Sequence, residues 1–257
     1  MSVTQRASHT YESARDSRSW SPDIRAALRR FRPERKKRGA AITFVVVRVS
    51  RLLMQRLNET EFIHLERFER AHRSGRGLLT LANHVSIADD PLLPSCFVSG
   101  RWAETRWTAV DALNFFSSPL MATLFNAGKG VPVVRGGGIH QPGVEFMKQR
   151  LLAGDWVHVF PEGTRTRRDD ARMGSLKPGF AHLIQTARPL VLPFHHRGMR
   201  DVLPVGGRLP KIGQSVTVRF GETVDSRQGL ADRSIAEIVD WGEAVFGELE
   251  DQALAAT

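Results

Sequence analysis

A histidine and an aspartate five residues apart, His84 and Asp89, stand in NHVSIADDP, directly after the apolar run GLLTLA. An imidazole held through one nitrogen by a carboxylate keeps its other nitrogen free to accept a proton from a hydroxyl. If that hydroxyl belongs to a substrate, the alcohol could attack an acyl ester directly, which is acyl transfer. Spacing alone does not decide this, because His196 and Asp201 repeat it. Asp89 could also cap a helix that begins near Pro91.

A second polar turn, VFPEGTRT, follows another apolar run, DWVH. Backbone N–H groups at such a turn, with Arg165 nearby, can hold a phosphate or a carbonyl oxygen. The alternative is a tight turn without a ligand, which Pro161 and Gly163 form readily. The turn is therefore a candidate binding site, and its role depends on what stands beside it.

The third candidate is Arg135, which precedes three glycines in GKGVPVVRGGG. An arginine there can pair bidentately with a phosphate, and glycines allow the backbone to approach closely. The string matches neither of the common glycine-rich nucleotide-binding patterns, so a surface arginine before a loop remains the alternative. No group of residues has convincing metal-ligand spacing, and we expect no metal.

Each candidate follows a short apolar run, and such runs alternate with segments of helical length from residue 76 onward. This rhythm predicts an α/β domain with a largely parallel central sheet, in which sites form at the carboxyl ends of strands. The expected strands are GLLTLAN, RWTAV, VPVV, DWVHVF, PLVLPF and SVTVRF, and the expected helices cover 89–98, 111–127, 139–152, 175–187 and the segment DRSIAEIVDWGEAVFGEL.

The N-terminal part of the chain differs in composition from the rest. Residues 1–38 hold eleven Lys and Arg against four Asp and Glu, which is most of the net charge of +10. We expect a basic, largely unstructured arm there, with at most a short helix at PDIRAALRRF. Such an arm favours an anionic partner, either a membrane or a nucleic acid. The lone cysteine, Cys96, excludes an internal disulfide and fits a reducing compartment.

Residues 39–58 are predicted to form an amphipathic helix, with Arg48 and Arg51 on one face and Val45 and Val49 on another. The apolar run is too short to cross a bilayer. With basic residues just upstream, the segment resembles an interfacial helix on an anionic membrane surface. An ordinary helix packed on the core is the alternative. Residues 59–257 would then form one domain.

Taken in order, NHVSIAD, GKGVPVVR, VFPEGTRT and LVLPFHHRGM resemble the four sequence blocks of the glycerolipid acyltransferases, which include the lysophosphatidate acyltransferases. Within that family, NHVSIADDP, GDWVHVFPEG and HRGMRDVLP are most similar to the tafazzin group of phospholipid–lysophospholipid transacylases. FPEGTRT is closer to the lysophosphatidate acyltransferase version, and this leaves the acyl donor open.

The resemblance implies a two-layer α/β acyltransferase fold with an N-terminal interfacial helix, and an acyltransferase domain at 59–257. It implies that His84 is the general base and that Asp89 orients it. The substrate-binding residues that it implies are Arg135, Glu162, Gly163, Thr164 and Arg165. Glu162 would position Arg135 or its own loop rather than touch a phosphate. No cofactor is implied, because acyl-CoA or a phospholipid would be a donor substrate.

The expected function is transfer of a fatty acyl chain to the hydroxyl of a lysophospholipid or lysophosphatidate. A phospholipid donor is preferred, and an acyl-CoA- or acyl-carrier-dependent 1-acylglycerol-3-phosphate acyltransferase is the alternative. Expected partners are lipid substrates and an anionic membrane surface. The protein would be monotopic, on the cytoplasmic face of an inner membrane, or mitochondrial in a eukaryote.

Three other functions stay open as rivals to acyl transfer. A nucleic-acid-binding protein would explain the basic composition, but most of the excess charge lies in the arm, so we expect no nucleic acid. A non-catalytic membrane-binding module and a lipid hydrolase are the others. The sequence indicates no oligomeric state.

Overall fold

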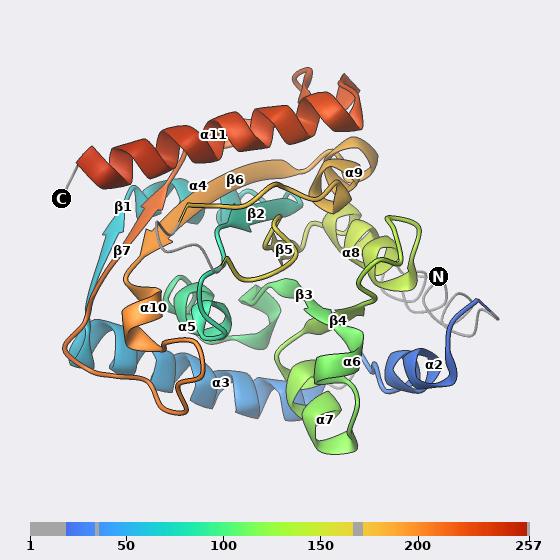
Figure 1. Cartoon of the computed structure of the whole chain (residues 1–257), viewed down its shortest axis with the longest axis horizontal. Coiled ribbons are helices and arrows are strands. Elements are labelled where there is room, and N and C mark those ends of the chain that lie inside the picture. The colour runs from blue at the N-terminus through green and yellow to red at the C-terminus, as the bar shows by residue number, and fades with distance from the viewer. Residues whose placement is uncertain (1–18, 34–35, 167–171, 256–257) are drawn as a thin grey trace.

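The computed structural model of the protein describes residues 19–33, 36–166 and 172–255 (Figure 1). Strands alternate with helices along the chain, as the pattern of apolar runs predicts. The strands are β1 (Glu59–Ile63), β2 (Leu78–Ala82), β3 (Trp107–Asp111), β4 (Gly130–Val133), β5 (Trp156–Val159), β6 (Leu190–Arg197), β7 (Ser215–Phe220) and β8 (Val224–Asp225). The helices are α2 (Pro22–Arg29), α3 (Lys36–Leu52), α4 (Leu65–Arg73), α5 (Asp89–Cys96), α6 (Ala112–Phe115), α7 (Pro119–Ala127), α8 (Pro142–Leu152), α9 (Gly179–Ala187), α10 (Met199–Val202) and α11 (Ile235–Ala255), with short turns η1 (Leu53–Leu57), η2 (Trp102–Glu104) and η3 (Leu230–Asp232).

The strands form one sheet in the order β1-β7-β6-β2-β5-β3-β4, and β8 pairs with β6. Strands β6, β2, β5, β3 and β4 run parallel to one another, whereas β7 is antiparallel to β6. The prediction of an α/β fold with a largely parallel sheet is confirmed. Strand β1, which pairs with β7 in parallel, was not expected, because its sequence ETEFI lacks a continuous apolar run.

The sheet is covered by helices on both faces. Leu79 and Leu81 of β2 lie in one apolar cluster with residues of α8, α9 and α11, while Leu78 and Ala82 lie in a second cluster with residues of α3, α4 and α5. Side chains alternate between the two faces of a strand, so the clusters lie on opposite faces. Figure 1 shows α11 and α3 on opposite sides of the strands. The expectation of two layers is therefore wrong in this respect, since all five residues of β2 are buried and need cover on both sides.

The short helix predicted at PDIRAALRRF is confirmed as α2, but residues 19–33 are packed on the core rather than unstructured. Helix α2 begins after Ser21, whose hydroxyl accepts a hydrogen bond from the Ile24 N–H at 3.3 Å. Leu28 and Phe31 are 0% and 2% exposed, and the Phe31 ring packs edge-on against Phe146. Charge dominated the composition of this segment, but two apolar side chains three residues apart suffice to bury one helix face. The rest of the predicted arm, residues 1–18 and 34–35, lies outside the described residues.

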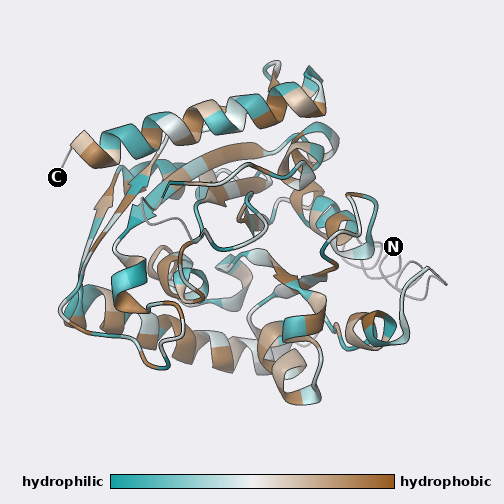
Figure 2. Cartoon of the chain, in the orientation of Figure 1, coloured by the Kyte–Doolittle hydropathy of each residue, from teal (hydrophilic) through white to brown (hydrophobic). Residues whose placement is uncertain are grey.

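Helix α3 packs on α5 and α7 through a face that is largely small or polar. The side chains buried on that face belong to Thr43, Val47, Ser50 and Met54. The large apolar side chains face outward, and four of them are 52–58% exposed: Phe44, Val45, Val49 and Leu52. Brown apolar segments accordingly recur along α3 in Figure 2. The helix therefore packs on the core, as the alternative expects, but it does so through the Val47 face, and the face that carries Val45 and Val49 points outward. No helix in the described ranges is long and apolar enough to cross a bilayer.

Candidate active site

His84 and Asp89 meet at the carboxyl end of β2. The His84 Nδ1 lies 2.9 Å from the Asp89 Oδ2, and the two side chains are 20% and 1% exposed. A carboxylate only accepts hydrogen bonds, so Nδ1 carries the proton that lies between them. The neutral imidazole therefore keeps Nε2 as its acceptor, which is the tautomer that a general base requires.

The Asp89 carboxylate is held by the turn that precedes it rather than by its own helix. Its Oδ2 also accepts hydrogen bonds from the Val85 and Ser86 backbone N–H groups, at 2.7 and 2.9 Å. The capping alternative for Asp89 therefore fails, because a cap would accept N–H groups further along α5. Three donors on one oxygen stabilise the charged carboxylate and fix its position beside the imidazole.

The neighbouring strand β5 places Phe160 against the face of the His84 ring. The two rings are stacked, with centroids 4.0 Å apart and planes 16° apart. With Asp89 holding one edge of the imidazole, this contact sets the plane of the ring. Phe160 belongs to the block VFPEGTRT, but sequence reasoning treated it as part of a strand and assigned it no role in the site.

The turn after β5 clamps the His84 backbone from two sides. The buried Glu162 accepts the His84 N–H at 3.1 Å and the Gly174 N–H at 2.9 Å, one on each carboxylate oxygen. The Thr166 N–H donates to the His84 carbonyl oxygen at 2.7 Å. Burial raises the pKa of the Glu162 carboxyl, and the two N–H groups oppose that shift. Glu162 therefore positions the turn that carries His84, and neither of these two contacts involves Arg135.

Helix α11 holds the segment 173–176, which includes Gly174, through two of its glutamates. The Glu250 carboxylate accepts the Met173 N–H at 2.7 Å, and Glu243 accepts the Leu176 N–H at 3.3 Å. Gly174 lies between these two anchored residues. A chain of hydrogen bonds thus runs from α11 through residues 173–176 to Glu162 and on to His84.

The other residues of the turn are more accessible. Gly163 has a φ of 67°, a left-handed conformation that favours glycine, and its N–H donates to the Phe160 carbonyl at 3.0 Å. Thr164 is exposed and Arg165 is half-buried. These three residues line the rim of the turn beside His84, where they remain available to a ligand.

Arg135 lies at the same sheet edge but not beside His84. It follows β4, three strands from β2, which corresponds to about 14 Å at normal strand spacing. Its Nε lies 3.0 Å from the Asp111 Oδ2, and its side chain is 59% exposed. Asp111 also caps α6 by accepting the Asn114 N–H at 2.8 Å. The sequence analysis did not single out Asp111.

A buried polar group lies beneath Asp89. The His196 N–H donates to the Asn83 Oδ1 at 2.9 Å, and the Asn83 amide donates to the His196 carbonyl at 2.9 Å. The His196 Nε2 lies 3.0 Å from the Asn83 carbonyl and 3.7 Å from the Asp89 Oδ2. Burial lowers the pKa of His196, so its imidazole is neutral and Nε2–H donates to that carbonyl. His196 therefore belongs to the same site, whereas Asp201, which repeats the spacing, is exposed.

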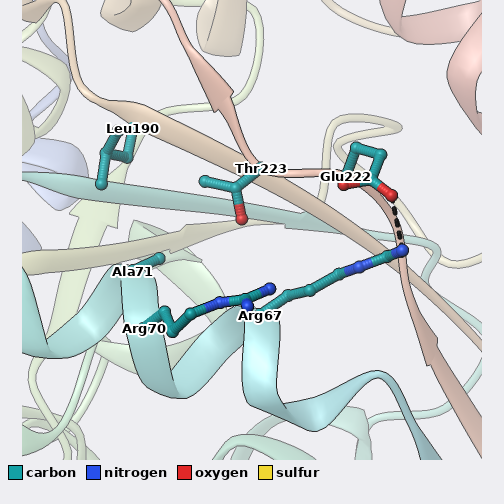
Figure 3. Close-up of a pocket in the computed structure, with 6 residues that line it drawn as sticks. All are labelled: Arg67, Arg70, Ala71, Leu190, Glu222 and Thr223. Atoms are coloured by element: carbon teal, nitrogen blue, oxygen red, sulfur yellow. Dashed lines mark ion pairs between the residues drawn. The ribbon is translucent and has the colours of Figure 1, made fainter.

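A cavity of about 340 Å³ lies elsewhere, lined by Arg67, Arg70, Ala71, Leu190, Glu222 and Thr223 (Figure 3). Leu190 is the first residue of β6 and pairs in register with Leu78, the first residue of β2. His84 follows the last residue of β2, so the cavity lies at the opposite edge of the sheet. It is not part of the candidate active site. Among the described residues, no group of three or more His, Cys, Asp or Glu could hold a metal ion.

The matches to known proteins follow the same segments. An acyltransferase family model matches residues 60–197, more than half of the chain, and its range contains the whole candidate site. The chain belongs to the acyltransferase family. It is 32% identical to the tafazzin of Drosophila melanogaster over 71% of this chain and 50% of that protein. It is 29% identical to a taffazin of Dictyostelium discoideum over 67% of this chain and 65% of that protein.

Two further proteins are similar to this chain, one in sequence and one in fold. An N-acylphosphatidylethanolamine synthase of Arabidopsis thaliana is 35% identical over 59% of this acyltransferase and 57% of its own length. The chain thus spans about half to two thirds of the curated relatives it matches. The crystal structure of the 1-acyl-sn-glycerophosphate acyltransferase PlsC from Thermotoga maritima superposes with a TM-score of 0.62 at 19% identity, covering 98% of this chain and 90% of that one. That likeness confirms the acyltransferase fold.

Proposed function

We propose that the protein transfers a fatty acyl chain to the hydroxyl of a lysophospholipid or lysophosphatidate. The observation that carries this proposal is the His84 Nδ1 to Asp89 Oδ2 contact at 2.9 Å. This contact leaves Nε2 as a proton acceptor at the mouth of a strand-end site. Membership in the acyltransferase family and the tafazzin relatives support acyl transfer as the reaction.

In the proposed step, His84 Nε2 takes the proton of the acceptor hydroxyl as the oxygen attacks the acyl carbonyl carbon. A tetrahedral intermediate forms, with negative charge on the former carbonyl oxygen. N–H groups of the glycine-containing turns are the candidate donors to that oxyanion. The intermediate then expels its leaving group, which takes the proton back from His84. The acyl group passes directly to the acceptor, so no enzyme nucleophile is needed.

Charge at the sheet edge supports a phosphate-bearing acceptor. Arg135 and Arg165 are the basic candidates for the phosphate, with Gly163 and Thr164 beside them on the turn. Arg135 contacts Asp111 through its Nε at 3.0 Å, and its side chain is 59% exposed, so a phosphate can approach the guanidinium from solvent. Glu162 is proposed to act through the catalytic loop rather than through the ligand.

The donor is proposed to be a phospholipid, because two of the relatives described above are tafazzins. In that reaction the leaving group is a lysophospholipid alcohol. If acyl-CoA were the donor, the leaving group would be the thiolate of coenzyme A. The alternative 1-acylglycerol-3-phosphate acyltransferase would need such a thioester and would use the same His84 and Asp89.

A second candidate acceptor is an amine. The relative with 35% identity is named for the synthesis of N-acylphosphatidylethanolamine, in which the acyl group is bound to nitrogen. The same histidine could take a proton from an attacking amine. Product analysis separates the two, since an amide survives mild alkaline hydrolysis whereas an ester does not.

We also propose that the enzyme is a peripheral protein of an anionic membrane. The outward apolar face of α3 supports this, because exposed apolar side chains of this size and number mark interaction surfaces. The cytoplasmic face of an inner membrane, or a mitochondrial membrane in a eukaryote, remains the expected place.

The first experiment combines purified protein with liposomes that contain isotope-labelled lysophospholipid and unlabelled intact phospholipid. One arm contains acyl-CoA and the other does not, and His84→Ala is the control in both. Mass spectrometry reads the products. Labelled diacyl lipid without acyl-CoA would establish transacylation.

The other outcomes are equally decisive. Product that requires acyl-CoA would identify the biosynthetic acyltransferase, and labelled free fatty acid alone would identify a hydrolase. Full product formation by His84→Ala would refute the assignment of the site.

A further inference from the structure

The segment between α10 and β7 exposes apolar side chains in an unusual way. Val205, Leu209 and Ile212 are 59%, 80% and 62% exposed, and Leu209 is the most exposed large hydrophobic side chain in the described residues. Connecting loops are normally polar, because nothing in the fold covers them. Three large apolar side chains within eight residues therefore call for a partner.

The loop has a defined shape rather than a loose one. The Gly207 N–H donates to the Pro204 carbonyl at 2.9 Å, and the Lys211 N–H donates to the Val202 carbonyl at 2.7 Å. These bonds close the loop on itself at its base. The apolar side chains are thus held outward by the backbone conformation.

Its two ends are tied to the elements that matter for the proposed reaction. The Ser86 hydroxyl of the catalytic turn donates to the Leu203 carbonyl at 2.8 Å. At the other end, the Gly213 N–H donates to the Leu57 carbonyl at 2.8 Å, where η1 continues α3. The Asn58 amide adds a bond to the Lys211 carbonyl at 3.2 Å. The loop therefore bridges the active site and the helix whose apolar face is exposed.

Apolar side chains are also exposed in the two segments to which the loop is bonded. Leu57 at the end of η1 is 44% exposed and Ile87 in the catalytic turn is 55% exposed. Figure 1 shows the loop beside α3, on the side of the molecule opposite α11. The loop thus lies between η1, which continues α3, and the turn that carries His84.

The charges in the loop decide among possible occupants. Arg208 and Lys211 are exposed between the apolar residues, and the sequence from 202 to 221 contains no Asp or Glu. Apolar side chains that insert, flanked by cations that stay at the level of the headgroups, match a bilayer with anionic lipids. A surface built for a protein partner or a second copy would not need this one-sided charge.

We propose that residues 204–213, here named the insertion loop, form a second membrane attachment that acts together with α3. Two attachment points that lie apart on the surface fix the orientation of the protein relative to the bilayer. Attachment through α3 alone would leave the protein freer to tilt about the axis of that helix. The attachment turns the His84 turn toward the bilayer, so that a lipid acceptor can enter from it. This inference rests on the proposed function, because it assumes a substrate that resides in a membrane.

The test compares the triple variant Val205→Ser, Leu209→Ser, Ile212→Ser with a matched control, Leu152→Ser, Leu254→Ser. The control residues are also exposed, at 53% and 49%, but lie on α8 and α11. Binding is measured by co-sedimentation with vesicles of phosphatidylcholine alone and with phosphatidylglycerol added. Activity is measured on vesicle-borne substrate and on substrate dispersed in detergent.

The triple variant should bind anionic vesicles at least tenfold more weakly and lose vesicle activity in proportion. Its detergent activity and melting temperature should stay within twofold and a few degrees of wild type, as should all values for the control. Replacing Arg208 and Lys211 by Gln should reduce binding to anionic vesicles and leave binding to phosphatidylcholine unchanged.

Unchanged vesicle binding by the triple variant would overturn the inference, and so would a change in its oligomeric state without a change in vesicle binding. If the triple variant does not fold, the single change Leu209→Ser should still weaken binding severalfold, and no effect would count against the loop. A wild-type protein that binds vesicles through the loop but is inactive in both assays would refute the proposed function instead.

Discussion

At the scale of single residues, the His84 imidazole is held at its edge, at its face and through the His84 backbone. Asp89 bonds to Nδ1, Phe160 stacks on the ring, and Glu162 binds the His84 N–H. Each contact removes a different freedom of the side chain before a substrate binds. Preorganisation of this kind reduces the reorganisation that the reaction would otherwise require.

Replacing His84 by Ala should lower kcat about 10³-fold or more, because the proton acceptor is lost. Asp89→Asn should cost about 10²-fold, since an amide can still accept the turn N–H groups but no longer stabilises the imidazolium. Initial rates at saturating lipid in detergent, with melting temperatures for each variant, would measure both losses. If a variant is unfolded at the assay temperature, its loss of activity reflects lost stability. Near wild-type kcat in a folded His84→Ala variant would contradict the assigned role.

Asp90 is expected to contribute to stability rather than to catalysis. It pairs with Arg106, and the two side chains are only 10% and 7% exposed. Asp90→Asn should leave the arginine without its counter-charge and lower the free energy of unfolding by about 3 kcal/mol. It should reduce activity less than Asp89→Asn does. Urea denaturation measures the change.

The matched control for that prediction is Asp232→Asn. Asp232 also pairs with an arginine, Arg188, but the two side chains are 57% and 48% exposed. Breaking a solvated pair should change stability by less than about 1 kcal/mol. Equal losses for Asp90→Asn and Asp232→Asn would contradict the role assigned to burial.

At the scale of elements, helix α3 combines two surfaces with different tasks. Its inner face holds Val47 against the second apolar cluster, at 1% exposure, while Val49 two residues later is 55% exposed. Two residues correspond to about 200° of rotation around a helix. Substitutions of Val47 and of Val49 therefore test the fold and the outer surface separately.

Val47→Ser should lower the free energy of unfolding by about 1–3 kcal/mol, because a buried methyl pair is replaced by a hydroxyl. Val49→Ser should leave stability within about 0.5 kcal/mol of wild type and should weaken binding to anionic vesicles. Thermal melting and vesicle co-sedimentation measure the two effects. Weakened vesicle binding by Val47→Ser alone would show that the faces have been assigned the wrong way round.

At the scale of the whole molecule, the centre of the sheet holds buried histidines that are neutral in the folded state. Burial lowers the pKa of His158 well below its usual value, and burial beside His196 and Arg197 lowers the pKa of His195 to about 3. His196 shifts in the same direction. In the unfolded chain the same side chains take up a proton near pH 6.5.

Protonation therefore favours unfolding as the pH falls. A lowered folded pKa means that the stability is fully present above about pH 6.5 and is lost progressively toward the folded pKa. Each histidine that is neutral in the folded protein and protonated in the unfolded chain contributes up to about 1.4 kcal/mol per pH unit to this slope. Urea denaturation between pH 7.5 and 5.5 should show the fall, and His195→Gln should reduce its slope.

The control for the pH prediction is His64→Gln, because the His64 side chain is 45% exposed. Its replacement should change the slope less than His195→Gln does. A free energy of unfolding that is flat between pH 7.5 and 5.5 in the wild-type protein would contradict the burial argument.

Sequence alone was sufficient for features set by local chemistry. The pairing of His84 with Asp89 spans five residues and one turn, so it is a local feature of the chain. Spacing alone did not separate it from His196 and Asp201, and the four sequence blocks in order singled it out. The alternation of apolar runs and helical segments likewise predicts parallel strands, since each needs a crossover. The four blocks in order indicated the acyltransferase family, and the family match at residues 60–197 confirms it.

Tertiary structure decided what depends on strand order and on which face packs inward. Glu162 reaches His84 because β5 pairs with β2, and His196 reaches Asn83 because β6 pairs with β2 on the other side. The apolar pattern predicts that these strands are buried, but it does not predict which strands are neighbours in the sheet. The same limit applies to α3, because amphipathicity marks two faces and only the packing on α5 and α7 shows that the apolar one points outward.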